Sequence, residues 1–476
     1  MEEMSLSRQL AEEVLRFKAN DLPEEVIHQA KRLVLDTLGC AIGGYQSETA
    51  TVLRSLLAEL QGPREATVIG GKKTSCLNAA LANGAMARSL DFNDAVVTEI
   101  DGAYRVGYHP SEVIPPIMAL GEKQHLSGLE VMATIVLGYD LSNRFLEGIV
   151  GREMEQRGWN GDTRGAYIMP LIAGRILNLD AGQMANAVGI SGSLQSVLGI
   201  LDASAEEYTM TKNIRFPSMA YGGILAAMMA RNGFTGPPRV IEGHDGFIEV
   251  FLEGQYDAAK LTDSKRRFTI LDTCIKSVIA DYSAHGHLCA TLSLVRQHDI
   301  MPQDVASVKI TASTRCARHT GHPAKKYPRN KETADHSSYY LTAVAIMERA
   351  VGPEQFVPEK YSDPEILGLI DKIVFEGDKD IDTKFLTAGT SEIVTKQGKK
   401  YTCRIDYPRG HARNPMTDKE IVDKFRSMAR KHMDQRQIDG MVRTVFSLEK
   451  LDDIGKLNRQ LMFRGLSKPD PRLKHP

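Results

Sequence analysis

The sequence has 476 residues, of which 42% are hydrophobic and 25% are charged, and its formal net charge is -1. A chain of this length usually forms at least two domains, and a net charge near zero argues against a nucleic-acid-binding protein, which normally has a basic surface. No segment approaches the roughly 18 uninterrupted apolar residues that cross a membrane. The acidic, amphipathic N-terminus lacks the features of a secretory signal, so we expect a cytoplasmic protein with no nucleic-acid or membrane partner.

The predicted elements begin with a series of helices, because apolar residues recur at helical spacing up to about residue 260. The nearly continuous apolar run at 33–42 predicts a central, buried helix that ends at Gly43 and Gly44. Among these predicted helices, residues 66–69 are instead expected to form a short extended segment. The predicted helices span residues 5–17, 23–42, 48–60, 75–89, 113–125, 128–146, 165–177, 181–200 and 219–232.

The pattern changes near Leu261, where strands join the helices. Residues 305–312 alternate between apolar and polar, which predicts a strand, and segments 392–395 and 401–405 are expected to form a hairpin across Gln397 and Gly398. Further helices are predicted at 333–349, 363–375, 418–432 and 437–451. The predicted fold class is therefore mainly α with an α+β domain.

The chain lacks the common motifs of metal and cofactor binding. Its six cysteines are scattered and form no CxxC pair, so we expect reduced thiols and neither a disulfide framework nor a zinc site. There is no phosphate-binding loop, no dinucleotide-binding GxGxxG after a strand and no HExxH. We expect no metal and no cofactor.

The stretch from 85 to 116 is the strongest candidate for a proton-transfer site. It places Asp91, Asn93 and Asp94 close together and then delivers His109 just before an apolar run. Acids and an imidazole on irregular backbone suit proton transfer, since the pKa of histidine lies nearest neutrality. The alternative is a helix end capped by aspartate, followed by a turn in which His109 caps the next helix.

Four later stretches also gather polar residues inside apolar surroundings. They are 158–164 with Asn160, 210–218 with Lys212 and Arg215, 276–287 with Lys276, Asp281 and His285, and 335–340 with His336 and Tyr340. Each could equally be a solvated helix end or a cap. Lysine and arginine beside acid-base groups nevertheless suggest an anionic substrate.

These residue types suffice for the removal of water from a hydroxy acid. That reaction needs a base, an acid for the leaving hydroxyl, and cations for the charge that builds on the carboxylate. The side chains that could supply these roles without a metal are Asp91, His109, Lys212, Lys276 and Tyr340. The inventory permits a lyase but does not by itself establish one.

Several motifs in the same order resemble the MmgE/PrpD family, which comprises dehydratases, decarboxylases and epimerases of carboxylic acids. They are LVLDTLGCAIGG at 33–44, SLDFNDA at 89–95 with HPSEVIPP at 109–116, TKNIRFPSMAYGG at 211–223, ADHSSYY at 334–340 and YPRGHARNPMTDKE at 407–420. Lys276 with His285 also resembles a lysine and a later histidine of the family. The matches extend over nearly the whole chain.

The resemblance implies an all-α helical domain at 1–262, an α+β lid at 263–412 and C-terminal helices at 413–476 that pack back on the helical domain. It also implies a homodimer, no cofactor and a site between the helical domain and the lid. The implied catalytic residues are Asp91, His109, Lys212, Lys276 and Tyr340. The implied substrate-binding residues are Asp94, Arg105, Asn160, Arg215, His285 and His336.

The chain also departs from the family pattern. Ala95 stands where relatives often have threonine or cysteine, Asn160 stands near a family histidine with Asp162 as a rival, and Arg215 replaces another histidine. The segment between Asp91 and His109 also looks longer than in relatives, adding Asp101, Tyr104 and Arg105. We therefore expect a substrate other than 2-methylcitrate itself.

The predicted function is a cofactor-independent hydro-lyase that acts on a di- or tricarboxylic hydroxy acid of the citrate or 2-methylcitrate kind. A decarboxylase of a cis-aconitate-type acid and an epimerase or isomerase of a dicarboxylic acid are the alternatives. A catalytically inactive relative that binds an acid or an assembly partner remains a further possibility.

Overall fold

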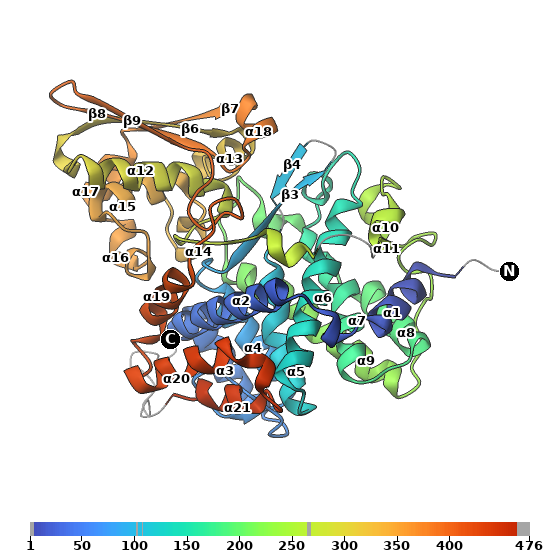
Figure 1. The fold of residues 1–476 in the computed structure, drawn as a ribbon. Coiled ribbons are helices and arrows are strands. Elements are labelled where there is room, and N and C mark those ends of the chain that lie inside the picture. The colour runs from blue at the N-terminus through green and yellow to red at the C-terminus, as the bar shows by residue number, and fades with distance from the viewer. Residues whose placement is uncertain (1–3, 101–102, 107, 264–267, 464–476) are drawn as a thin grey trace.

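The computed structural model describes residues 4–100, 103–106, 108–263 and 268–463. A large helical body carries a smaller domain in which helices cover one face of a four-stranded sheet (Figure 1). The observed fold class is therefore the predicted one, mainly α with an α+β domain. None of the described helices is both long and apolar enough to span a membrane.

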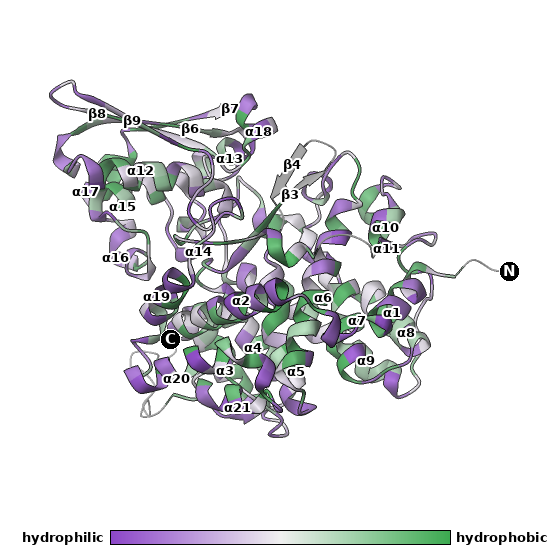
Figure 2. Ribbon diagram, viewed as in Figure 1, coloured by the Kyte–Doolittle hydropathy of each residue, from purple (hydrophilic) through white to green (hydrophobic). Residues whose placement is uncertain are grey.

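The body consists of helices whose inward faces are apolar. They are α1 (Leu6–Arg16), α2 (Glu24–Gly43), α3 (Glu48–Leu60), α4 (Cys76–Arg88), α5 (Ile114–Lys123), α6 (Gly128–Glu147), α7 (Gly165–Ile176), α8 (Ala181–Leu194), α9 (Arg215–Arg231), α10 (Phe247–Leu252) and α11 (Ala258–Thr262). Hydroxyl or carboxylate caps begin several of them, among them Ser5, Ser75 and Ser127. Figure 2 shows hydrophobic residues along the central helices α6 and α7.

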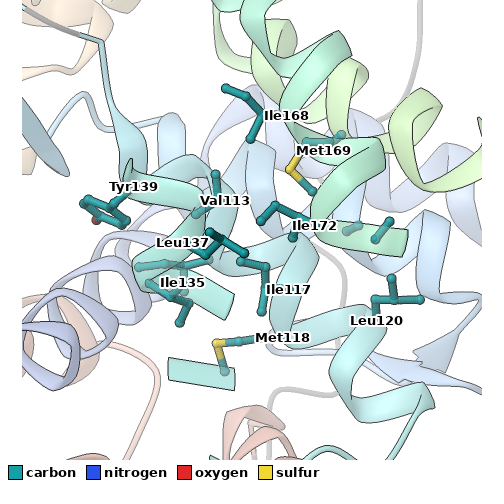
Figure 3. Close-up of a cluster of buried hydrophobic side chains, with 14 of the residues drawn as sticks. Val113, Ile117, Met118, Leu120, Ile135, Leu137, Tyr139, Ile168, Met169 and Ile172 are labelled. Atoms are coloured by element: carbon teal, nitrogen blue, oxygen red, sulfur yellow. The ribbon is translucent and has the colours of Figure 1, made fainter. Parts of the chain in front are cut away.

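The core of the body is formed where α5, α6 and α7 meet. Figure 3 shows Ile117 of α5, Leu137 of α6 and Ile172 of α7 in one cluster, and all three are fully or almost fully buried. Burial of each such side chain contributes about 1.5–3 kcal/mol. This rigid scaffold supports the loops that carry the polar residues described below.

The smaller domain is built on a sheet with strand order β7-β6-β8-β9. The strands are β6 (Val305–Ser313), β7 (Ile373–Asp378), β8 (Gly389–Thr395) and β9 (Lys400–Ile405). Strands β6 and β7 are parallel, while β8 pairs antiparallel with both β6 and β9. The accompanying helices are α12 (His285–Gln297), α13 (Thr314–His319), α14 (Lys331–Ala334), α15 (Ser338–Glu348), α16 (Pro358–Tyr361), α17 (Pro364–Ile370) and α18 (Lys379–Lys384).

The last helices return to the body. They are α19 (Asp418–Ala429), α20 (Gln435–Phe446) and α21 (Gly455–Asn458). Helices α19 and α20 lie beside α2, and Ile421 and Phe425 of α19 belong to the same hydrophobic core as Val34 and Leu38 of α2 (Figure 1). Lys424 forms a buried ion pair with Asp36 at 2.7 Å.

Most predicted helices are confirmed, but several boundaries differ. Helix α8 ends at Leu194, well before residue 200, and α9 begins at Arg215, so Arg215 lies in its first turn. The helix predicted over 333–349 is interrupted, because the Ser337 hydroxyl caps α15 by accepting from the amide of Tyr340. The segment predicted as helix 363–375 contains α17 and then the first residues of β7, which pair with β6.

The stretch from 85 to 116 contains a hairpin where irregular backbone was expected. Strands β3 (Asp94–Ile100) and β4 (Ala103–Val106) pair antiparallel, and β3 also pairs with β5 (Thr273–Ile275). Strands β1 (Ala66–Thr67) and β2 (Lys73–Thr74) form a second small ribbon. The prediction of an essentially all-α first part was therefore wrong in detail, because pairing with the distant β5 outweighs local sequence pattern.

Candidate active site

A cavity of about 780 Å³ is lined by residues from both the helical body and the smaller domain. The body contributes Arg88, His109, Asp202 and Arg215, among others. The smaller domain contributes Asp281, Arg315, Arg318, His319 and His336, again among others. Segments that lie far apart in the sequence thus surround one space with ionisable side chains, which favours this cavity as the active site.

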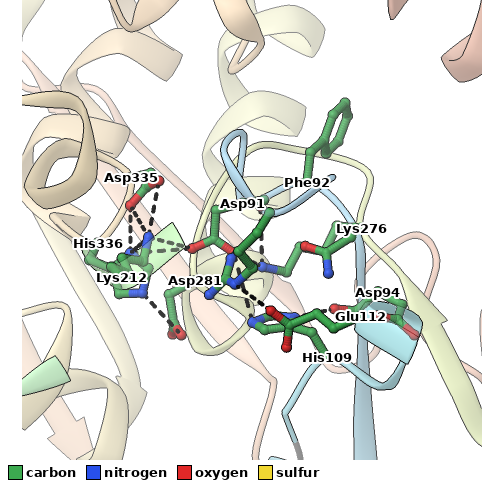
Figure 4. Close-up of polar contacts among 12 residues, drawn as sticks. Asp91, Phe92, Asp94, His109, Glu112, Lys212, Lys276, Asp281, Asp335 and His336 are labelled. Carbon is green, nitrogen blue, oxygen red and sulfur yellow. Dashed lines mark hydrogen bonds and ion pairs between the residues drawn. The ribbon is translucent and has the colours of Figure 1, made fainter. Parts of the chain in front are cut away.

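Asp91 is the centre of the buried charge cluster behind this cavity. It follows the end of α4 in a left-handed backbone conformation, with φ of +50°. Its carboxylate accepts hydrogen bonds from Arg88 at 2.8 Å, from Lys212 at 3.1 Å and from Lys276 (Figure 4). The structure therefore brings together Asp91 and both lysines predicted from the sequence.

The charge state of Asp91 follows from these partners. Burial by itself would raise the pKa of the Asp91 carboxyl, but the positive charges of Arg88, Lys212 and Lys276 outweigh it and hold the pKa well below its usual range. Burial lowers the pKa of Lys276, and the charge of Asp91 opposes that shift. Both lysine side chains are fully buried and lie behind the cavity, not in its lining.

Asp335 extends the cluster toward the smaller domain. Lys212 lies in the turn before α9 and donates to Asp335 at 3.0 Å, and Lys331 donates to the same carboxylate at 2.6 Å. The Nδ1 atom of His336 lies 2.6 Å from the same carboxylate. The break between α14 and α15 is what turns Asp335 and His336 toward Lys212, so the interruption of the predicted helix is part of the site.

His109, from the stretch at 85–116, places its imidazole at the cavity wall. Its Nδ1 atom donates a hydrogen bond to the backbone carbonyl of Asp94, because a carbonyl oxygen only accepts. The Nε2 atom therefore carries the lone pair, and it lies 4.0 Å from Asp91 Oδ1. Burial lowers the pKa of His109 well below its usual value, and the charges of Arg88 and Lys276 lower it further, so the ring is neutral.

Two other carboxyl groups near His109 have pKa values that burial raises. Burial raises the pKa of Asp94 to about 6, although hydrogen bonds from Ser111 and Tyr139 oppose the shift. Burial also raises the pKa of Glu112 to about 8, with Asp162 adding to the shift and Arg88 opposing it. Asp94 positions the His109 segment, and Glu112 lies 3.5 Å from the Nε atom of Arg88.

Arg215 is already bound by two carboxylates. Its guanidinium lies 2.9 Å from Asp162 and 3.0 Å from Asp202. Asn160 is buried and lies two residues before Asp162. Its side-chain oxygen accepts a hydrogen bond from the backbone amide of Asp162. Asn160 therefore caps the turn that presents Asp162, and Arg215 lines the cavity as the third member of an ionic group.

Three predicted site residues lie elsewhere or cannot be placed. Tyr340 is buried in the core of the smaller domain, its hydroxyl donates to the carbonyl of Gln355, and it does not line the cavity. His285 is fully buried near the Tyr282 ring and does not line the cavity either. Arg105 belongs to β4, but its side chain lies outside the described part of the structure.

Sequence reasoning missed several residues of the site. Arg88 precedes Asp91 by three residues at a helix end, and this spacing could have identified it as a partner. Glu112 lay inside the HPSEVIPP motif but was not singled out. No local signal marked Asp202, Arg315, Arg318 or His319, because only the tertiary structure brings them to the cavity.

Donor atoms of Asp202, His319 and His336 lie within 4.8 Å of one another, which is close enough for a metal ion. A second such group, His244 with Asp245 and Glu249, is exposed on the surface. The first group faces the cavity and the second does not, since none of its members lines that space.

Comparison with known families identifies the architecture. The family profile described as MmgE/PrpD N-terminal domain matches residues 8–259, more than half of the chain. The chain belongs to the MmgE/PrpD family. The profile described as MmgE/PrpD C-terminal domain matches residues 280–446. The resemblance inferred from the sequence motifs is thereby confirmed, and the cavity lies where the two MmgE/PrpD domains meet.

Similar proteins in the MmgE/PrpD family include cis-aconitate decarboxylases. The enzyme of that name from Aspergillus terreus is 25% identical over 92% of this chain and 92% of its own length. The human cis-aconitate decarboxylase is 24% identical over 98% of this chain and 96% of its own length. A cis-aconitate decarboxylase-like protein from Aspergillus oryzae is 23% identical over 96% of this chain and 97% of its own length.

Proposed function

We propose that this chain is a lyase that decarboxylates an unsaturated tricarboxylic acid of the cis-aconitate kind. Relatives named as cis-aconitate decarboxylases support this alternative better than the hydro-lyase preferred from the sequence alone. The observation that carries the proposal is the position of His109 at a cavity wall, directly in front of the Asp91, Lys212 and Lys276 cluster.

The chemistry requires one proton and several cations. When a carboxylate leaves as carbon dioxide, its carbon–carbon bond breaks and the electron pair remains on the substrate skeleton. That skeleton then takes up one proton at carbon, and the remaining carboxylates must be held while the charge moves. The cavity offers arginines for the carboxylates and an imidazole for the proton.

His109 is the proposed proton donor. Its Nδ1–H is committed to the Asp94 carbonyl, so only Nε2 can exchange a proton with the substrate. Its side chain is 12% exposed, and it lines the cavity. The negative charges of a bound polycarboxylate would raise the pKa of this imidazole and load Nε2 with the proton that the substrate carbon receives.

Arg88 and the two buried lysines are the proposed source of positive potential. Arg88 lines the cavity while bound to Asp91, so its guanidinium can face a substrate carboxylate. Lys212 and Lys276 lie behind Asp91 and act at a distance, where low dielectric makes their charges effective. Asp91 positions all three cations.

The test is to follow cis-aconitate, citrate and 2-methylcitrate by proton NMR in deuterated water. We expect cis-aconitate to lose carbon dioxide and the product to gain one deuterium at carbon. Loss of water from citrate or 2-methylcitrate would establish a hydro-lyase in its place, and deuterium exchange without breakdown would establish an epimerase. Absence of all three reactions over this panel would contradict the proposal.

The pH dependence separates an acid role of His109 from a base role. The pKa of His109 in the free protein is well below 6.5, owing to burial. If His109 donates a proton, kcat/KM falls as pH rises above that pKa. If it accepts a proton, as dehydration or epimerisation would need, kcat/KM rises through the same pKa, and that result would overturn the assigned role.

A further inference from the structure

We propose that Tyr108 is a specificity-determining residue whose ring limits the size of the substituent on the substrate carbon that His109 protonates. Tyr108 directly precedes His109 in the chain, and both residues line the cavity. The inference rests on the proposed decarboxylation and deepens it, because it states which acids of the cis-aconitate kind the cavity admits. Acids with a hydrogen on that carbon fit, and acids with a methyl or larger group do not.

The phenol end of Tyr108 occupies space that a glycine leaves free. Its ring carbon and its oxygen lie directly against Gly161, and a methyl group at residue 161 would overlap both atoms. Glycine is the residue that permits so close an approach to the backbone. The position of the Tyr108 ring therefore depends on the absence of a side chain at residue 161.

A buried cation covers the face of the same ring. The guanidinium carbon of Arg164 lies 4.4 Å from the centroid of the Tyr108 ring and 5.6 Å from that of the Phe216 ring. Arg164 also donates to the Gly161 carbonyl at 3.0 Å and to the Asp162 carboxylate at 2.8 Å. Arg164 is only 1% exposed, and a cation excluded from water is attracted strongly to an aromatic face. The ring is thus held both at its face and at its phenol end.

The turn behind Tyr108 is itself fixed by a second segment of the helical body. The backbone amide of Asn160 donates to the Val197 carbonyl at 2.8 Å, and that of Gly199 donates to the Gly158 carbonyl at 2.9 Å. A ring packed against such a turn cannot retreat without breaking these contacts. Tyr108 is half-buried, so the remainder of its ring is a fixed boundary of the cavity beside the proposed proton donor.

One methyl group is enough to test this boundary. In 2-methyl-cis-aconitate a methyl group takes the place of the hydrogen on the double bond of cis-aconitate, while the three carboxylates are unchanged. A difference of one carbon in a fitted pocket changes kcat/KM by about 10–200-fold. We expect the wild type to prefer cis-aconitate over its methyl homologue by a factor in this range.

Two substitutions at Tyr108 separate the boundary from a structural role. Tyr108→Ala opens the space, so the preference for cis-aconitate should fall at least about tenfold. Tyr108→Phe keeps the ring, so the preference should stay as in the wild type. A residue that only supports the fold would lower kcat/KM of both acids by the same factor, and an unchanged preference in Tyr108→Ala would overturn the proposal.

Gly161→Ala tests the contact from the other side. Its methyl group should push the Tyr108 ring into the cavity and lower kcat/KM for cis-aconitate about tenfold or more. In the Tyr108→Ala background the overlap is gone, so Gly161→Ala should have little further effect, and additive losses would contradict the contact. The matched control is Gly368→Ala in α17, where no atom of the described residues lies within 4 Å of an added Cβ; it should leave kcat/KM unchanged.

Calorimetry with both acids gives a second readout that needs no turnover. The ratio of their Kd values should shift in Tyr108→Ala and not in Tyr108→Phe. A shifted Kd ratio without turnover would reject the decarboxylase and retain the role of Tyr108. Turnover of cis-aconitate with both ratios unchanged in Tyr108→Ala would overturn the role of Tyr108 and leave the decarboxylase intact. Circular dichroism verifies the fold of each variant, and Tyr108→Leu takes the place of Tyr108→Ala if that variant does not fold.

Discussion

Two cavities of similar volume differ sharply in their chemistry. The cavity of about 780 Å³ has His109, Arg88 and His336 in its wall and the Asp91 cluster behind it. The cavity of about 880 Å³ is bordered by apolar residues such as Met428 and by cations, three of which have partners. Its Arg296 donates to the Arg349 carbonyl, Arg409 pairs with Glu420, and Lys431 pairs with Glu354.

The comparison teaches that burial of charge, and not cavity volume, distinguishes the candidate active site from the other cavity. The Lys431 side chain is 51% exposed, so water screens its charge. Lys276 and Asp91 are almost completely excluded from water, so each charge strongly shifts the pKa of its neighbours. Acid-base catalysis needs neighbouring groups whose pKa values are shifted in different directions by burial and by nearby charges. This condition holds around the cavity of about 780 Å³, which favours it as the active site.

The strongest test of this difference is His109→Ala. Removing the proposed proton donor should lower kcat/KM for cis-aconitate by about 10²–10⁴-fold, the usual contribution of general acid-base catalysis. Arg296→Ala in the larger cavity should leave kcat/KM unchanged. Steady-state kinetics measure both variants, and equal losses would remove the distinction between the two cavities.

Lys276→Met should have the next largest effect, on stability. It removes one of the cations around buried Asp91, and breaking a buried ion pair costs about 3–5 kcal/mol of unfolding free energy. We expect the lower end, because Arg88 and Lys212 remain. Urea denaturation measures the loss, and Lys431→Met in the larger cavity should change stability by less than about 0.5 kcal/mol.

The double variant Lys276→Met with Asp91→Asn tests the cause of that loss. Removing the uncompensated charge should restore part of the stability, so the two substitutions are not additive. If the two losses of stability simply add, the double variant is less stable than Lys276→Met by the full effect of Asp91→Asn alone. That result would indicate that lost packing, and not an uncompensated charge, explains the effect of Lys276→Met.

Glu112 should make the free energy of unfolding decline between about pH 4.5 and pH 8. Its pKa is raised from 4.5 to about 8 by burial, so the folded protein holds a proton that the unfolded chain releases. The stabilising contribution is therefore complete below pH 4.5 and declines as pH rises toward about 8. Glu112→Gln should remove this decline, whose slope is about 1.4 kcal/mol per pH unit for one proton.

Denaturation of both proteins from pH 5 to 9 measures the difference for Glu112. The matched control is Glu354→Gln at the larger cavity, where the hydrogen bond from Lys431 lowers the pKa of Glu354. That substitution should leave the decline of stability between pH 5 and 8 unchanged. If the free energy of unfolding changes with pH in the same way for wild type and Glu112→Gln over this range, Glu112 does not hold a proton in the folded protein.

The smallest predicted effect concerns Arg318, an exposed residue at the wall of the smaller cavity. Its guanidinium is expected to hold a distal carboxylate of the substrate equally in the ground and transition states. Arg318→Ala should therefore raise KM about tenfold without changing kcat. Arg430→Ala, an exposed arginine of the larger cavity, should change neither constant; a fall in kcat for Arg318→Ala would instead assign it a role in the chemical step.

Much of the fold was predictable because its signals are local. Helix α3 was predicted over its whole length, and the hairpin of β8 and β9 was predicted from two alternating runs around Gln397 and Gly398. Caps, helical spacing and turn residues act within about four positions of one another. The β3–β4 hairpin escaped prediction because β3 is held by β5, far away in the sequence.

By itself, the sequence determined the family, the fold class and the polar stretches from which the site is built. Asp91, His109, Lys212 and Lys276 were all predicted, and they do lie together. Only the tertiary structure decided that both lysines lie behind the cavity, that Arg88 lies beside Asp91 and Glu112, and that Tyr340 is buried in the core of the smaller domain. The physical reason is that residue type determines what a side chain can do, whereas burial and neighbours far along the chain determine its charge and access.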